Sequence, residues 1–222
     1  MELASYLDST NLKADATAND IRNLCVEAAK LHMAAVCIQP YRLALACDLL
    51  QGSGVKRCTV IGFPLGADGL QSKLYLAAQA LADGADELDM VMNLGALKDG
   101  DYAKVEAEIK ALVELKKEQD FLLKVIVETA LLSREELIMV THMISASGAD
   151  YIKTSTGFST RGASLEDIKI IVAHREPHLK IKAAGGIKEL DMALQLIQAG
   201  ADRLGSSNAV FLLEEFRLRG GR

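Results

Sequence analysis

The sequence predicts a (β/α)8 barrel, a closed ring of eight parallel strands each followed by a helix, in one domain spanning residues 1–222. Eight short apolar runs recur along the chain, and a segment with helical periodicity follows each of them. Helices of ten or more residues separate the runs, as parallel pairing requires. A doubly wound open sheet is the alternative, but it usually has fewer units, and no GxGxxG motif follows the first run.

The predicted strands are short and mostly apolar. They lie at residues 5–10, 34–39, 58–63, 87–93, 121–129, 149–155, 179–186 and 201–207. The tripeptide Gly-Ala-Asp occurs three times between a helix and the next strand, at residues 84–86, 148–150 and 200–202. Because glycine takes the left-handed conformation that often ends a helix, this tripeptide marks the helix-to-strand joints.

The predicted helices begin at residues that favour a first turn. Thr17, Ser133 and Ser164 each have an acidic residue three positions on, which is the spacing of a capping box or a variant of it. Pro40 suits the first turn of the second helix, and Ser72 opens the third. The other predicted helices include residues 101–119, 188–200 and 208–219.

Composition argues against several classes of protein. The 222 residues are 50% hydrophobic, enough for a large core, and the net charge of −5 with no basic block argues against a nucleic-acid partner. The sequence has no apolar run near the roughly 18 residues of a membrane span and no signal-peptide pattern at its start, so we expect a cytoplasmic protein without a membrane partner. Cys25, Cys37, Cys47 and Cys58 have no CxxC spacing, which predicts reduced core thiols.

Charged side chains stand near the C-terminal ends of the predicted strands, where barrel enzymes place their active sites. Lys124, Lys153 and Lys182 all lie within apolar runs. Side chains alternate along a strand, so Lys124 and Glu128 should share a face. An unpaired charge inside a barrel is unfavourable, and Asp89 and Glu128 are the acids available as partners.

Lys153 and Lys182 are each followed at once by a loop of hydroxyl or small residues. A single such lysine would be interpreted as a surface residue whose charge reaches water. For two neighbouring lysines, we expect the second ammonium and partial desolvation to lower the pKa. The free amine can then attack a carbonyl and form a Schiff base, while Asp89 moves protons. The pattern predicts carbonyl chemistry through an iminium or enamine.

The histidines argue against metal-dependent carbonyl chemistry. His32, His142, His174 and His178 fall in predicted helices or at helix ends, and none follows a strand. A histidine-bound zinc site is therefore not expected. A carboxylate-bound Mg²⁺ site stays open as an alternative, although the lysines would repel the ion. We expect neither a metal nor another cofactor.

Three loops predict an anion site. Residues 154–157, 184–186 and 205–208 offer glycines, hydroxyls and backbone N–H groups, and the last of them opens a helix whose dipole favours an anion. The loops follow the last three strands, and barrel enzymes often bind phosphate after strands 7 and 8. The residues alone predict an enzyme that acts on a small phosphorylated carbonyl compound through an amine.

Nearly the whole chain resembles deoxyribose-phosphate aldolase, from residues 7–12 to residues 200–207, and the blocks ELDMVMN and KTSTGF are the most specific. The resemblance implies a class I aldolase on a (β/α)8 barrel. It would cleave 2-deoxy-D-ribose 5-phosphate reversibly to acetaldehyde and D-glyceraldehyde 3-phosphate, without a metal, in the catabolism of deoxyribonucleosides. The resemblance also implies a homodimer.

The resemblance assigns roles to individual residues. Lys153 would form the Schiff base, Lys182 would tune it and share in proton transfer, and Asp89 would donate or accept protons. The other residues expected at the substrate and phosphate are Asp8, Thr10, Cys37, Lys124, Thr156, Gly157, Gly185, Gly186, Gly205, Ser206, Ser207 and Asn208. Asn208 is a departure, since relatives more often have serine or glycine there, but it can still donate a hydrogen bond.

Two alternatives stay open. Another Schiff-base aldolase or a transaldolase on the same barrel would use a different sugar phosphate, and the choice of donor substrate distinguishes it. A non-catalytic barrel would bind a sugar phosphate without turnover. The presence of all three reactive residues argues against this second alternative.

Overall fold

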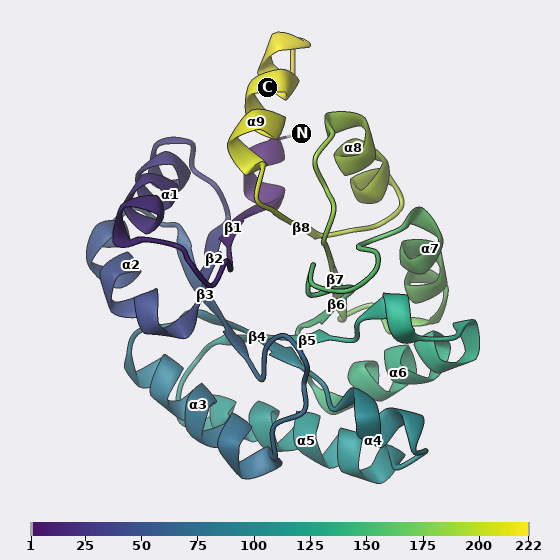
Figure 1. The fold of residues 1–222 in the computed structure, drawn as a ribbon. Coiled ribbons are helices and arrows are strands. Elements are labelled where there is room, and N and C mark those ends of the chain that lie inside the picture. The colour runs from purple at the N-terminus through teal and green to yellow at the C-terminus, as the bar shows by residue number, and fades with distance from the viewer. Residues whose placement is uncertain (1, 222) are drawn as a thin grey trace.

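The computed structural model describes residues 2–221, and within them eight parallel strands close into one barrel (Figure 1). Neighbouring strands follow one another in chain order, and β1 closes the ring by pairing with β8. The closed ring confirms the predicted barrel and excludes the open sheet. The strands are β1 Leu7–Asn11, β2 Ala35–Ile38, β3 Lys56–Ile61, β4 Glu87–Val91, β5 Leu122–Ile126, β6 Tyr151–Lys153, β7 Lys180–Ala184 and β8 Arg203–Ser206.

Helices form a ring around the strands in Figure 1, and both ends of the described chain lie on the same side, beside α9. They bury their apolar stripes against the outer face of the barrel, which makes the main core. Among the described residues, no helix is both long and apolar enough to cross a membrane. The helices are α1 Ala18–Lys30, α2 Leu43–Leu50, α3 Leu70–Ala82, α4 Leu94–Lys98, α5 Tyr102–Glu114, α6 Arg134–Ser147, α7 Leu165–His174, α8 Leu190–Gln198 and α9 Ala209–Leu218.

Most of the expected helix starts are confirmed. Thr17 and Ser133 form capping boxes, with hydrogen bonds in both directions. Ser164 accepts the N–H of Asp167 but receives nothing in return, because the carboxylate of Asp167 is bound elsewhere. Pro40 opens a single 3-10 turn that leads into α2.

Two helix boundaries and one short helix show how the structure departs from the prediction. The third helix begins at Leu70, two residues before Ser72. The helix expected over residues 101–119 ends at Glu114 and continues only as a 3-10 turn. The short α4 was not predicted because five residues carry too little periodicity, although Asn93 caps it with its side chain.

The Gly-Ala-Asp joints are confirmed and have a second function at the N-terminal end of the barrel. Their glycines have left-handed φ angles of 97°, 88° and 116°. Each aspartate also accepts the N–H of a residue in the preceding strand: Asp86 from Arg57 at 2.8 Å, Asp150 from Leu123 at 2.7 Å and Asp202 from Ile181 at 2.8 Å. The three aspartates therefore fasten β3 to β4, β5 to β6 and β7 to β8.

The interior of the barrel is divided into an apolar half and a charged half. The apolar half centres on β2 and β3, where Ala35, Cys37, Cys58 and Val60 form a small cluster of their own. The charged half is built by β1 and by β4 to β8. Its members are Asp8, Glu87, Asp89, Lys124, Lys153, Lys182 and Arg203. The candidate site lies in this charged half.

Candidate active site

Asp89 is the centre of the charged half. Its carboxylate is fully buried, and Lys153 Nζ and Lys182 Nζ both lie 2.7 Å from the same oxygen, Oδ2. Lys124 Nζ lies 2.8 Å from the other oxygen, Oδ1. The strand register brings them together, because Asp89 is paired with Lys124 in β5, and Lys153 with Lys182 in β7. The three residues predicted to carry the chemistry therefore meet at one carboxylate.

Two more acids and an arginine complete the ion-pair network. Asp8 Oδ2 lies 2.5 Å from Lys182 Nζ, and Glu87 Oε2 lies 2.6 Å from Lys124 Nζ. Arg203 joins the two acids, with Nη1 2.5 Å from Asp8 and Nη2 3.1 Å from Glu87. Buried charges are tolerated only when they are paired in this way.

The network determines the charge states of its members. Burial alone would raise the pKa of Asp89, but Lys124, Lys153 and Lys182 together hold it well below its ordinary value. Burial likewise opposes the charge on Asp8, and Lys182 and Arg203 nevertheless lower its pKa to about 2. Both aspartates are therefore carboxylates at neutral pH.

The expected lowering of the lysine pKa is wrong for Lys182. Burial does disfavour its charge, but Asp8 and Asp89 outweigh burial and raise the pKa of Lys182 well above its ordinary value. The same balance with Asp89 raises the pKa of Lys124. A neighbouring lysine alone would lower the pKa of Lys182, and the pairing with Asp8, which the sequence does not reveal, reverses the direction. Lys182 also lies in the middle of β7 and does not end it, whereas Lys153 is the last residue of β6.

The expectation that Glu128 pairs with an inward lysine is also wrong. Glu128 follows β5 and has a left-handed φ of 50°, so it leaves the alternation that would place it on the face of Lys124. Its Oε2 accepts hydrogen bonds from the backbone N–H and the hydroxyl of Thr156. Glu128 therefore supports the loop that follows Lys153.

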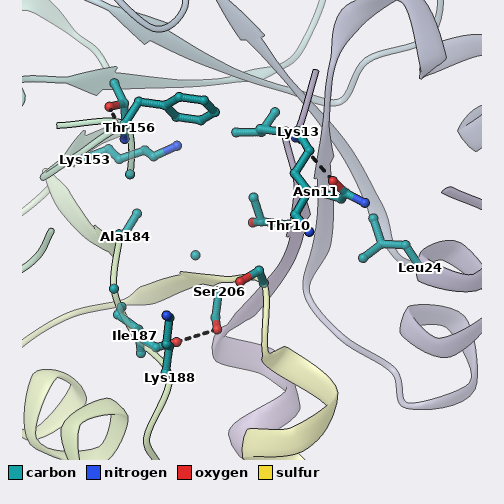
Figure 2. A pocket seen from close by; sticks show the side chains of 17 residues that line it. Thr10, Asn11, Lys13, Leu24, Lys153, Thr156, Ala184, Ile187, Lys188 and Ser206 are labelled. Atoms are coloured by element: carbon teal, nitrogen blue, oxygen red, sulfur yellow. Dashed lines mark hydrogen bonds between the residues drawn. The ribbon is translucent and has the colours of Figure 1, made fainter. Parts of the chain in front are cut away.

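A cavity of about 410 Å³ lies at the C-terminal ends of the strands, with Lys153 in its wall. Figure 2 shows Lys153 and Thr156 on one side, facing Thr10 and Asn11 on the other, with Ser206 and Lys188 along a third side. The predicted residues that line it are Thr10, Lys153, Thr156, Gly157, Gly185, Gly186, Gly205, Ser206 and Ser207. The cavity therefore joins Lys153, the residue predicted to form the Schiff base, to the three predicted anion loops.

The other predicted residues lie outside the cavity lining. Asp8, Lys124, Lys182 and Asp89 are fully buried in the ion-pair network, and Cys37 Sγ is 3.8 Å from Asp89 Oδ2. Asn208 is the N-cap position of α9, and its N–H donates to Ser206 Oγ. Ala184, part of the predicted anion loop 184–186, also lines the cavity, and sequence reasoning missed Asn11, Leu12, Lys13, Leu24, Phe158, Ile187 and Lys188.

Two glycines are explained by close approach. A Cβ at Gly205 would lie 3.2 Å from Cε of Lys182, so glycine leaves room for the lysine stem inside the barrel. A Cβ at Gly162 would lie 1.9 Å from the carbonyl oxygen of Gly185. The loop after β6 therefore packs directly on the loop after β7, backbone against backbone.

The three anion loops offer backbone donors. Among residues 2–221, no hydrogen-bond acceptor is present for the N–H groups of Gly185, Gly186 and Ser207. The hydroxyl of Ser206, in contrast, donates to the carbonyl of Ile187 at 2.7 Å and is not free to donate to a ligand. Ser207 directly precedes Asn208, the N-cap residue of α9, and the N-terminus of this helix adds a favourable dipole for an anion.

Cys37, Cys58 and Asp89 form the one trio of possible metal ligands found in the described residues, with ligand atoms within 4.8 Å of one another. Lys124 Nζ lies 3.4 Å from Cys58 Sγ and 2.8 Å from Asp89 Oδ1, so an ammonium group already occupies a cation position in this trio. Burial raises the pKa of Cys58 well above its ordinary value, so this thiol stays protonated. The residues present do not fit a metal site.

Cys58, Glu87 and Arg203 are the network members that sequence reasoning missed. Alternation gave the signal for two of them, since Glu87 is two residues from Asp89 in β4, and Arg203 is two residues from Gly205 in β8. Cys58 is paired in register with Glu87, which only the assembled barrel shows.

A cavity at the C-terminal ends of barrel strands, with a lysine in its wall and charged groups beneath it, is the arrangement of barrel enzymes. The comparison with known families agrees and is more specific. The sequence matches the DeoC/LacD family aldolases over residues 3–216, and the chain belongs to this family.

Relatives and solved structures extend the match over nearly the full length. A deoxyribose-phosphate aldolase of Aciduliprofundum boonei is 46% identical over 217 residues, covering 98% of both chains, and one of Thermococcus gammatolerans is 47% identical over 219 residues, covering 98% of this chain and 97% of the relative. The solved aldolase QR15 superposes with a TM-score of 0.93 at 39% identity, covering 98% of this chain and 97% of that one. The resemblance found in the motifs is confirmed.

Proposed function

We propose that the chain is a class I aldolase that cleaves 2-deoxy-D-ribose 5-phosphate reversibly to acetaldehyde and D-glyceraldehyde 3-phosphate, with Lys153 as the Schiff-base residue. The observation that carries the proposal is the shared contact of Lys153 and Lys182 with Asp89 Oδ2, each at 2.7 Å, beside a cavity with anion-binding loops. Relatives named deoxyribose-phosphate aldolase supply the choice of substrate.

The proposed reaction begins when the neutral amine of Lys153 attacks C1 of the open-chain sugar phosphate and loses water to form an iminium. Removal of the C3 hydroxyl proton then breaks the C2–C3 bond, and its electron pair moves into the iminium to form an enamine. D-glyceraldehyde 3-phosphate leaves. Protonation of the enamine at C2 and hydrolysis release acetaldehyde and restore the amine.

Asp89 and Lys182 are the groups proposed to move protons during these steps. Lys182 is protonated at neutral pH and can donate, because its pKa is held high by Asp8 and Asp89. Asp89 is a weak base while three ammonium groups surround it. As the C2–C3 bond breaks, the cationic iminium on Lys153 becomes a neutral enamine. This removes one of the three cations around Asp89 and raises its basicity while the C3 hydroxyl loses its proton.

The phosphate is proposed to bind at the loops after β6, β7 and β8. Backbone N–H groups of Gly185, Gly186 and Ser207 face no protein acceptor among the described residues, and Lys13 and Lys188 add positive charge to the rim. In this placement the substrate extends across the cavity, with C1 at Lys153 and the phosphate at these loops. We also propose a role in deoxyribonucleoside catabolism, in the cytoplasm, by an enzyme that forms a homodimer; a relative from Aeropyrum pernix is described as a tetramer.

Borohydride reduction in the presence of acetaldehyde tests the proposal. It should add a stable two-carbon group to the peptide that contains Lys153, as measured by peptide mapping with mass spectrometry. Lys13 and Lys188 line the same cavity and serve as internal control amines. Labelling of either one in place of Lys153, or no labelling, contradicts the assignment.

The choice of donor separates the remaining alternatives. Turnover with acetaldehyde supports the proposed aldolase, whereas turnover with a ketose phosphate instead would indicate a transaldolase or another aldolase. The variant Lys153→Leu should lose activity and keep the circular dichroism spectrum of the wild-type fold. Tight binding of the sugar phosphate without any turnover would indicate a non-catalytic binding protein.

A further inference from the structure

Glu128 is a buried acid for which the proposed reaction has no role. It is 3% exposed, lies two residues after the end of β5, and has a left-handed φ of 50° that is unfavourable for a residue with a long side chain. Within the described chain, its Oε1 is buried and has no hydrogen-bond partner. A strained backbone together with an unsatisfied buried oxygen lowers stability, and such features are found most often at functional sites.

Both side-chain hydrogen bonds of Glu128 go to Thr156 in the wall of the cavity. Its Oε2 accepts the backbone N–H of Thr156 at 3.2 Å and also the Thr156 hydroxyl. The next residue, Thr129, anchors the same loop from the other side, since its N–H donates to the carbonyl of Thr154 at 2.8 Å and its hydroxyl to Asp167 at 2.8 Å. The strained turn therefore holds the loop that follows Lys153.

The contact with Glu128 determines which way the Thr156 hydroxyl points. A carboxylate only accepts hydrogen bonds, so the single hydrogen of the hydroxyl is directed at Glu128 and away from the cavity. One lone pair of Thr156 Oγ1 accepts the N–H of Phe158 at 3.0 Å. A hydroxyl oxygen has two lone pairs, so one acceptor site remains for a ligand.

We propose that Glu128 is a positioning residue that fixes Thr156 as a hydrogen-bond acceptor, so that Thr156 recognises a hydroxyl group of the substrate. The inference rests on the proposed function, in which the hydroxyl belongs to the carbon next to the aldehyde of D-glyceraldehyde 3-phosphate. It changes the predicted role of Thr156, because a fixed acceptor repels phosphate oxygens and selects a donor. A site that pairs with a substrate hydroxyl discriminates against the analogue that lacks it.

The test compares two acceptor aldehydes in the addition of acetaldehyde: D-glyceraldehyde 3-phosphate and 3-oxopropyl phosphate, which has the same phosphate but no hydroxyl. The measured quantity is the ratio of kcat/KM for the first acceptor to kcat/KM for the second. We expect the wild-type enzyme to prefer the hydroxylated acceptor. Thr156→Val, which replaces the hydroxyl by a methyl, should lower the ratio on the order of tenfold.

Glu128→Asn is the central variant. Asparagine tolerates the left-handed conformation and is one methylene too short to replace the contact, so the fold should persist. In this variant the kcat/KM ratio of the two acceptors should fall to the same value as in Thr156→Val. The double variant of Glu128→Asn and Thr156→Val should have that same ratio, since Glu128 acts through Thr156. Glu128→Gln keeps an acceptor oxygen for the hydroxyl and should restore the wild-type ratio.

Asp167→Asn is the matched control. Asp167 is a buried acid that anchors the same loop through Thr129 and Arg161 but touches no hydroxyl of the cavity. This variant should change kcat/KM for both acceptors by the same factor. The inference would be overturned if Glu128→Asn lowered kcat/KM for both acceptors by the same factor. Additive effects on the kcat/KM ratio in the double variant would overturn it too. Failure of the wild-type enzyme to use either acceptor would overturn the proposed function, and this inference with it.

Discussion

The two ends of the barrel use aspartate in opposite ways. At the N-terminal end, Asp86, Asp150 and Asp202 each bind one basic side chain and one backbone N–H, and their side chains are 24%, 26% and 37% exposed. In the interior, Asp8 and Asp89 are fully buried and are shared among several cations. The first arrangement fastens neighbouring strands, and the second holds the amines that we propose carry the chemistry.

The difference lies in what each carboxylate replaces. An aspartate at the N-terminal end satisfies a backbone donor at the start of a strand and keeps contact with water, so it adds stability at little desolvation penalty. A fully buried carboxylate gives up all its hydration, and only the cations around it offset this loss of solvation free energy. We therefore expect substitutions in the interior to have large effects on activity and stability together, and those at the N-terminal end to affect stability alone.

The largest expected effect follows from Asp89→Asn. The variant removes the charge that Lys124, Lys153 and Lys182 share, and breaking such a buried network costs about 3–5 kcal/mol of unfolding free energy. Activity should also fall by roughly two to four orders of magnitude, as expected for loss of a proton-transfer group. Urea denaturation and steady-state kinetics measure the two losses, and an active variant of wild-type stability would remove Asp89 from the centre of the site.

An intermediate effect is expected from acid. The pKa of Asp8 is lowered from 3.8 to about 2 in the folded protein, so the unfolded chain binds more protons between these two pH values. The stability from Asp8 is therefore present above about pH 4 and is lost as pH falls through about 2, a difference of about 2 kcal/mol.

Asp8→Asn isolates this contribution. Its deficit in unfolding free energy relative to wild type should be largest near neutral pH and should shrink as the pH falls from 4 to 2. Denaturation at each pH measures the deficit. A deficit that stays constant over this range would show that Asp8 acts by shape and hydrogen bonding and not by charge.

The comparison also explains how much could be predicted from the sequence. The barrel and the three joints followed from periodicity and from the Gly-Ala-Asp tripeptide, because these are local signals. The meeting of Lys153, Lys182 and Asp89 also followed, but for a different reason than their expected place at strand ends. Lys182 and Asp89 lie in the middle of β7 and β4, and they meet Lys153 because side chains on the inner face of a closed barrel converge. The role of Asp89 as the shared partner was thus within reach of pattern reasoning.

The rest depended on geometry that no local pattern contains. The high pKa of Lys182 comes from Asp8, which is 174 positions away in the chain and adjacent only because β1 closes against β8. Strand alternation predicted that the side chain of Glu128 shares a face with Lys124. The left-handed φ of 50° at Glu128 breaks this alternation, and no local pattern in the sequence reveals it. Arg203 is two residues before Gly205, so alternation places both on the inner face of β8. A charged residue at the start of a strand is, however, also typical of a strand end that is exposed to solvent.

The smallest expected effect is at the N-terminal end, where Asp202 accepts the N–H of Ile181 at 2.8 Å and pairs with Arg175 at 2.9 Å. Asp202→Ala removes both contacts and should lower the unfolding free energy by about 1–2 kcal/mol, which is a fall in Tm of roughly 2–8 °C for a chain of this size. The kcat and KM should stay at their wild-type values, because the contact is at the opposite end of the barrel from the cavity.

Asp202→Asn is the control for this prediction, since its amide oxygen can still accept the N–H of Ile181 while the charge opposite Arg175 is lost. If the backbone hydrogen bond is the larger contribution, Asp202→Asn should retain most of the stability that Asp202→Ala loses, because a partly exposed ion pair contributes little. Equal losses in the two variants would assign the effect to the ion pair. A fall in kcat would show that the two ends of the barrel are coupled, and the division between fastening and chemistry would no longer hold.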